Sequence, residues 1–245
     1  MQANRRSSLT AGLAIVLMAV AAAFTFGYAH NTLIIPGDAP TTVSNLRTMS
    51  SLFTTEIFGW LIILFLDITA SIALYSYFKN ENQKVARAMG ALRLVYSAIL
   101  GFGIFNLIKI NNIFNSSANT ISETLQTKVM HSLNVFQSAW SMGLIIFGFH
   151  LLLLGYLVYK SYNIHRFWGV LLIIAAVSYI IVHTTKNFIP GSEHFVSIAE
   201  TVLGLPMAIG EVGFAVWLIV RGKQPKIVFR NKSNELKPEP KIQLS

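Results

Sequence analysis

Six long apolar stretches constrain this chain most, because each is long enough to cross a lipid bilayer as a helix. A transmembrane helix needs about 20 predominantly apolar residues. The stretches cover residues 9–30, 52–78, 88–110, 133–159, 167–185 and 198–220. The sequence therefore predicts an all-α fold, a polytopic membrane helix bundle with six transmembrane helices. Only 12% of the residues are charged, about half the share of a soluble domain, which argues against a water-soluble globule.

The first stretch also raises the question of a cleaved signal peptide, because Arg5 and Arg6 precede it. Its apolar run exceeds the roughly 7–15 residues of a signal-peptide core. We therefore expect a retained signal anchor. We expect the chain to divide into a cytoplasmic N-terminus at 1–8, a single transmembrane domain at 9–221 and a basic, disordered cytoplasmic tail at 222–245.

Basic residues predict the orientation of the helices. Of the 19 lysines and arginines, Arg93 lies inside a span, and four lie in or near loops on one side: Arg47, Lys109, Lys128 and Lys186. The remainder lie on the side of both termini, so both termini are expected in the cytoplasm of a multi-pass cell-membrane protein. The net charge of +9 then indicates attraction to anionic lipid headgroups, and no nucleic-acid partner is expected.

Four ionisable residues lie inside the predicted spans, where charge is costly and function is the default hypothesis. They are Asp67, Arg93, His150 and Glu211. At about 1.5 Å per residue they could share one layer in the cytoplasmic half of the bilayer. We expect a buried Asp67–Arg93 pair, and a Glu211–His150 contact as the functional centre. The alternative is that the layer is purely structural.

The outer ends of the spans carry further polar candidates, namely Glu56, Glu200 and His183. Glu56 precedes Asp67 by eleven residues, as Glu200 precedes Glu211, and eleven residues make about three helical turns. Each acidic pair therefore shares one helix face, which could line a proton or cation path. Alternatively, the outer acids are solvated.

Motifs for known chemistry are missing. The sequence contains no G-x-S-x-G, no P-loop, no G-x-G-x-x-G and no H-E-x-x-H pattern. Without cysteine there is no thiolate nucleophile or Cys-based metal site. No catalytic residue, metal site or cofactor is predicted, and the missing motifs count against an enzyme.

Three segments together resemble a known family: FHLLLLGYLVYKS at 149–161, RFWGVLL at 166–172 and GEVGFAVWLIVRG at 210–222. They are similar to the bacterial and archaeal membrane family catalogued as domain of unknown function 4386. That family typically has proline where His165 stands. The resemblance implies a prokaryotic multi-pass inner-membrane protein whose recurrent polar positions are those of the buried layer, and it implies no reaction.

Three classes of function remain open. The first is a small transporter, or a proton- or ligand-responsive membrane protein, that uses the buried layer. The second is an intramembrane enzyme acting on a lipid or another apolar substrate. The third is an assembly protein in which the layer serves packing alone. A structure would separate them by showing whether the four residues surround a hydrated cavity. A dry, fully paired layer would favour the third class, and a cavity open to lipid would favour the second. The oligomeric state is not indicated.

Overall fold

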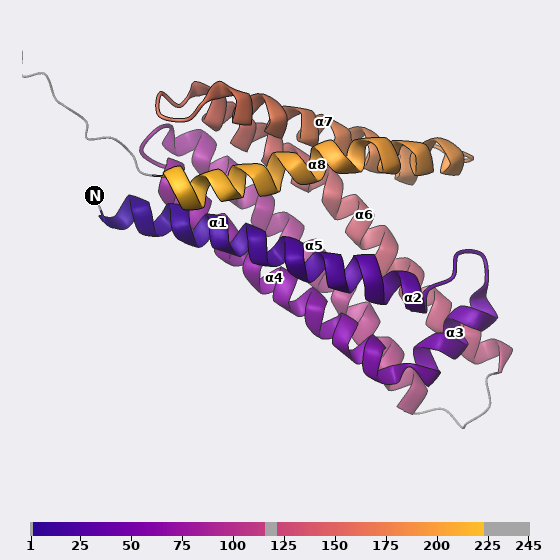
Figure 1. The fold of residues 1–245 in the computed structure, drawn as a ribbon. Coiled ribbons are helices and arrows are strands. Elements are labelled where there is room, and N and C mark those ends of the chain that lie inside the picture. The colour runs from indigo at the N-terminus through magenta and orange to yellow at the C-terminus, as the bar shows by residue number, and fades with distance from the viewer. Residues whose placement is uncertain (1, 116–121, 223–245) are drawn as a thin grey trace, which may run out of the picture.

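The computed structural model describes residues 2–115 and 122–222, which are almost entirely helical and contain no strand (Figure 1). The first span combines α1 (Gln2–Ala22), the π-helix η1 (Ala23–His30) and α2 (Asn31–Leu33). The others are α4 (Ser50–Phe78), α5 (Gln83–Asn115), α6 (Glu123–Lys160), α7 (Arg166–Phe188) and α8 (Glu193–Arg221). These six spans are long and apolar enough to cross a membrane, so the predicted fold class is confirmed. The predicted tail at 222–245 lies, apart from Gly222, outside the described residues.

One helix was not expected. Residues 31–51 have turn-rich sequence, yet α3 (Ala39–Thr48) forms within them. Asp38 caps it, because its carboxylate accepts from the Thr41 backbone N–H at 3.0 Å and from the Thr41 hydroxyl at 2.6 Å. These bonds, the hydroxyl bond first, hold the pKa of Asp38 below its ordinary value. Pro40 is compatible with the helix because it lies in the first turn, where backbone N–H groups lack intrahelical partners.

The six spans form a ring. Each span packs against the span that follows it in the sequence, and α8 packs back against α1. Both described chain ends lie at one end of this ring, which we call the termini end (Figure 1). The opposite end carries α2 and α3, and we call it the α3 end. A ring of this kind places one side of every span toward a common interior.

Glycines allow α6 and α7 to approach closely. A Cβ atom at Gly155 would lie 3.0 Å from the Gly169 carbonyl oxygen and 2.8 Å from Ile173 Cγ1. A Cβ atom at Gly148 would lie 3.1 Å from the Ala176 carbonyl oxygen. Small residues at such contacts are the usual basis of helix packing in membranes.

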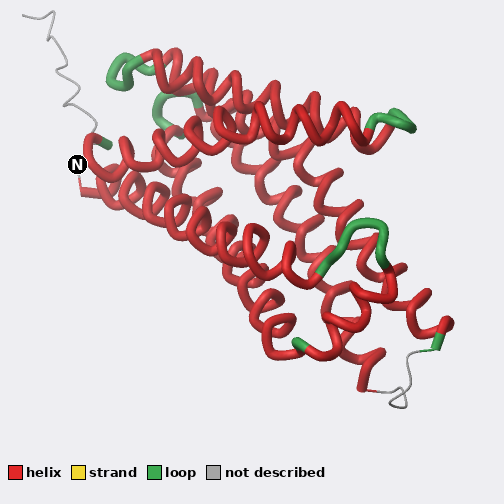
Figure 2. The backbone as a smooth tube through the Cα atoms, turned by 45° about the vertical axis from the view of Figure 1, so that its right-hand side comes forward, coloured by secondary structure: helices red, strands yellow, loops and turns green. Residues whose placement is uncertain are grey.

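The contact between α1 and α8 is confined to the termini end. There, a Cβ atom at Gly12 would lie 2.6 Å from the Ala215 carbonyl oxygen. Arg5 Nη2 donates to the Ile219 carbonyl at 2.6 Å, and Ser8 Oγ donates to the Leu218 carbonyl at 3.1 Å. Toward the α3 end, the two helices diverge in both views (Figures 1 and 2). The ring is therefore tight at one end and splayed at the other.

The α6–α7 contact gives a testable prediction. Gly155→Ala should destabilise the protein by about 1–3 kcal/mol, because the added methyl group meets backbone and Ile173 atoms that must move. Thermal unfolding in detergent measures the effect. Gly204→Ala on α8 is the matched control, since no atom lies within 4 Å of its added Cβ. Equal melting temperatures for the two variants would contradict the close α6–α7 contact.

Candidate functional site

An ion pair between α4 and α5 lies at the centre of the ring. Arg93 Nε donates to Asp67 Oδ1 at 2.7 Å, and Nη2 lies 2.5 Å from the same oxygen. The Ser97 hydroxyl lies 3.3 Å from Asp67 Oδ2 and 2.9 Å from the Arg93 carbonyl oxygen, and these two acceptors share its one hydrogen. Asp67 and Arg93 are both completely buried. The expected Asp67–Arg93 pair is therefore present, and both carboxylate oxygens of Asp67 have partners.

His150 attaches α6 to this pair. Its Nε2 lies 3.1 Å from Arg93 Nη1, and its Nδ1 lies 2.9 Å from the Met89 carbonyl oxygen. A guanidinium can only donate hydrogen bonds, so Nε2 accepts and Nδ1 carries the hydrogen that is donated to Met89. His150 is therefore a neutral acceptor in this arrangement. The Arg93 guanidinium also lies over the Phe147 ring, 5.1 Å from its centroid.

Glu211 belongs to the same layer but differs from the expectation. Its side chain interacts electrostatically with Arg93, the Tyr179 hydroxyl and Asp67. The partners of His150 are Arg93 and Met89, so the expected Glu211–His150 contact is wrong. The physical reason is that Arg93 already occupies Nε2 of His150. Glu211 is only half-buried, because it faces a cavity.

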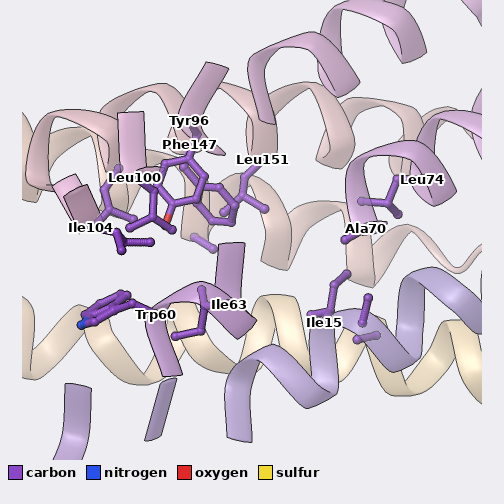
Figure 3. Close-up of a cluster of buried hydrophobic side chains, with 14 of the residues drawn as sticks. Ile15, Trp60, Ile63, Ala70, Leu74, Tyr96, Leu100, Ile104, Phe147 and Leu151 are labelled. Carbon is purple, nitrogen blue, oxygen red and sulfur yellow. The ribbon is translucent and has the colours of Figure 1, made fainter. Parts of the chain in front are cut away.

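That central cavity has a volume of about 280 Å³ and is bounded by all six spans. Ile15 and Met18 of α1, Trp60 and Asp67 of α4, and Glu211 of α8 are part of its wall. Figure 3 shows Trp60 and Ile63 on one side of this core and Tyr96 and Phe147 on the other. Toward the termini end the core is filled by fully buried side chains, among them Ala11, Leu74, Met89, Leu151 and Leu218.

A second, larger cavity of about 570 Å³ continues toward the α3 end, and we call it the vestibule. It lies where α1 and α8 diverge, between η1 and α2 on one side and α6, α7 and α8 on the others. Five residues line both cavities: Phe26, Trp140, Leu144, Tyr179 and Ala208. The two cavities therefore adjoin, and Asp67 and Glu211 lie at the inner end of the path.

The π-helix η1 shapes this path. A π-turn is rare and commonly occurs at functional sites. Here it brings Phe26 to the wall of both cavities and His30 to the wall of the vestibule. It also brings Thr25 against α4 at Gly59, where a Cβ atom would collide with the Thr25 hydroxyl. Gly59 therefore permits the close approach that positions η1.

The outer polar candidates occupy separate places around the vestibule. Glu56 is completely buried, and one of its oxygens binds His30 Nδ1 at 2.6 Å and Trp60 Nε1 at 3.2 Å. The alternative of a solvated Glu56 is therefore wrong. Glu200 is exposed and pairs with Lys186 at 3.1 Å. His183 is buried, with Nδ1 3.0 Å from Ser141 Oγ. Across the described ranges, no three His, Cys, Asp or Glu side chains converge as a metal site would require.

The sequence analysis did not identify most of the aromatic residues that line the central cavity. Tyr96, Trp140 and Tyr179 line the central cavity, although none of them was a candidate. A signal was present, because tyrosine and tryptophan in membrane helices prefer the two interfaces. These three lie well inside their helices. An aromatic residue that carries a polar group at mid-span is therefore a candidate site residue, as a charged residue at that depth is.

The fold and the buried layer define the chain as a polytopic α-helical membrane protein. Over residues 10–222 it matches the family described as domain of unknown function (DUF4386), and it belongs to this family. An uncharacterized protein of Archaeoglobus fulgidus is 31% identical over 169 residues, which cover 69% of this chain and 85% of the relative. No solved structure matches the chain.

The ion pair gives a second prediction. Asp67→Ala should lower stability by about 3–5 kcal/mol, because it leaves the Arg93 charge buried and unpaired. Adding Arg93→Leu should restore much of that loss, although His150 then lacks its donor. Thermal unfolding in detergent measures the coupling.

The exposed Lys186–Glu200 pair is the matched control. Its removal by Lys186→Leu and Glu200→Ala should change stability by no more than about 1 kcal/mol. Additive effects of the Asp67 and Arg93 substitutions would show that the central pair is not energetically coupled.

Proposed function

We propose that this protein binds a small ligand in its central cavity, as a transporter or a ligand-responsive protein of the cell membrane. The observation that carries the proposal is the cavity itself, which all six spans line and which adjoins the vestibule. A layer that served packing alone would be filled by side chains, as the termini end is. Binding pockets are characteristically concave, mostly apolar and furnished with a few polar groups.

The proposed orientation follows from the basic residues. Both chain ends would lie in the cytoplasm, and the α3 end with its vestibule would face outward. The ligand would then enter from the outer side, and the packed core at the termini end would separate it from the cytoplasm. Asp67, paired with Arg93, and Glu211 would set the electrostatic field at the bottom of the cavity. The basic tail, which lies outside the described residues, would contact anionic lipid.

Cysteine labelling tests whether the cavity is hydrated, since the chain contains no cysteine of its own. Ala208→Cys and Val212→Cys place a thiol on the cavity wall. A small charged methanethiosulfonate reagent should label both, because it reaches a thiol through water and not through hydrocarbon.

Two controls accompany this experiment. Ala175→Cys lies in a fully buried contact, and Ile209→Cys lies beside Ala208 on the exposed surface of α8, away from either cavity wall. Neither should react in a bilayer. If the two cavity thiols are as unreactive as these controls, the interior is dry and the layer is structural.

The same approach tests the orientation in intact cells. A membrane-impermeant thiol reagent should label Ser51→Cys, near the start of α4, and should leave Tyr162→Cys unlabelled. Tyr162 is 99% exposed in the connection between α6 and α7, so the lack of labelling would reflect its side of the membrane. Tyr162→Cys should react once the cells are permeabilised. The reverse pattern would invert the proposed orientation.

A further inference from the structure

The wall of the central cavity contains acidic residues and no lysine or arginine. Two carboxylates reach it, those of Asp67 and Glu211. Arg93 neutralises Asp67, and Arg93 itself is not part of the wall. Glu211 is in none of the ion pairs formed by the described residues, and Tyr179, which lines the same cavity, is neutral. A ligand with a positive charge would therefore supply the counter-ion that Glu211 lacks.

Six aromatic residues surround the same space: Phe26, Trp60, Tyr96, Trp140, Phe147 and Tyr179. Trp140 meets Phe26 and Trp60 in edge-to-face contacts, with ring centroids 4.8 Å and 5.0 Å apart. Phe147 meets Tyr179 in the same way at 5.4 Å. Aromatic faces attract cations through their quadrupoles, most strongly in a desolvated site. Phe147 already has the Arg93 guanidinium over its ring, so this environment accommodates a cation.

The wall is mostly apolar, and its hydrogen-bonding groups are those of the two acids and of Trp60, Tyr96, Trp140 and Tyr179. The indole N–H of Trp60 already donates to Glu56, and most other lining side chains are aliphatic or aromatic. The many hydroxyls of a sugar would exceed these partners, and the carboxylate of an amino acid would find no basic residue on the wall, each at a cost in affinity. The chemistry therefore favours a cation that needs no hydrogen bonds and carries an apolar body.

We propose that the central cavity binds an organic cation, an ammonium group with apolar substituents, with the Glu211 carboxylate as its counter-ion. This inference rests on the proposed ligand-binding function and specifies the class of ligand. The ammonium lies among the aromatic rings near Glu211. The cavity volume of about 280 Å³ holds a small ring with its ammonium group, and a longer substituent extends into the vestibule.

The experiment compares two probes of nearly equal shape that differ in charge, benzyltrimethylammonium and its neutral carbon analogue, neopentylbenzene. Each is titrated into the full-length protein in lipid nanodiscs, and empty nanodiscs correct for partitioning. Binding is measured from tryptophan fluorescence, since Trp60 and Trp140 line the cavity. The cation should bind at least about tenfold more tightly than the neutral probe, which corresponds to about 1.4 kcal/mol.

Glu211→Gln keeps the size of the side chain and removes its charge. It should abolish the preference for the cation while leaving the binding of the neutral probe unchanged. Glu193→Gln is the matched control, since Glu193 is an exposed acid on the same helix and lies on neither cavity wall. It should retain the full preference. The comparison of the two probes on the unmodified protein stands even if Glu211→Gln fails to fold.

The outcomes separate this inference from the proposed function. Equal binding of both probes to the unmodified protein would overturn the cation assignment and leave a ligand-binding cavity. A cation preference that persists in Glu211→Gln would overturn the role of Glu211. If neither probe binds and the cavity thiols also remain unlabelled, both the inference and the proposed function fail.

Discussion

The arrangement of the spans depends on one buried cation. A guanidinium in a low-dielectric interior is tolerated only when its charge is paired and each of its nitrogens finds a partner. Arg93 meets this requirement with Asp67 from α4, His150 from α6 and the thioether of Met18 from α1, at 3.9 Å. Because these partners come from three other elements, the satisfaction of a single side chain fixes the positions of four spans.

The sequence predicts the fold well because hydrophobic length is a strong signal in membrane proteins. The six spans follow from the length of the apolar stretches. The Asp67–Arg93 pair follows from the cost of exposing charge to hydrocarbon, because the depth of each charged residue can be counted along its span. The Glu211–His150 contact did not follow, since residues at the same depth can face different neighbours around a ring. The rotation of each helix about its axis is determined by packing. In this ring Tyr179 of α7 lines the same cavity wall as Glu211, whereas His150 bonds to α5.

Two structural features could not be read from the sequence at all. The π-helix at Ala23–His30 has no simple sequence signature, yet it alters which side chains of the first span face the interior. The cavity is a property of several helices together, because it exists only where α1 and α8 separate. At one end, these helices are held together by Arg5, Ser8 and Gly12. At the other end, their separation results from the packing of the whole ring, so single residues in the sequence do not mark it.

The two hydrogen bonds of His150 have a mechanical consequence. Met89 and Arg93 are four residues apart on α5, so they stand one helical turn apart on the same face. The His150 ring lies between them, with one nitrogen on the backbone below and the other on the side chain above. Sliding α6 along α5, or rotating it, would break both bonds at once. The imidazole therefore fixes the axial register of α6 against α5. A motion that changes access to the cavity while keeping these two bonds must involve other helix pairs of the ring.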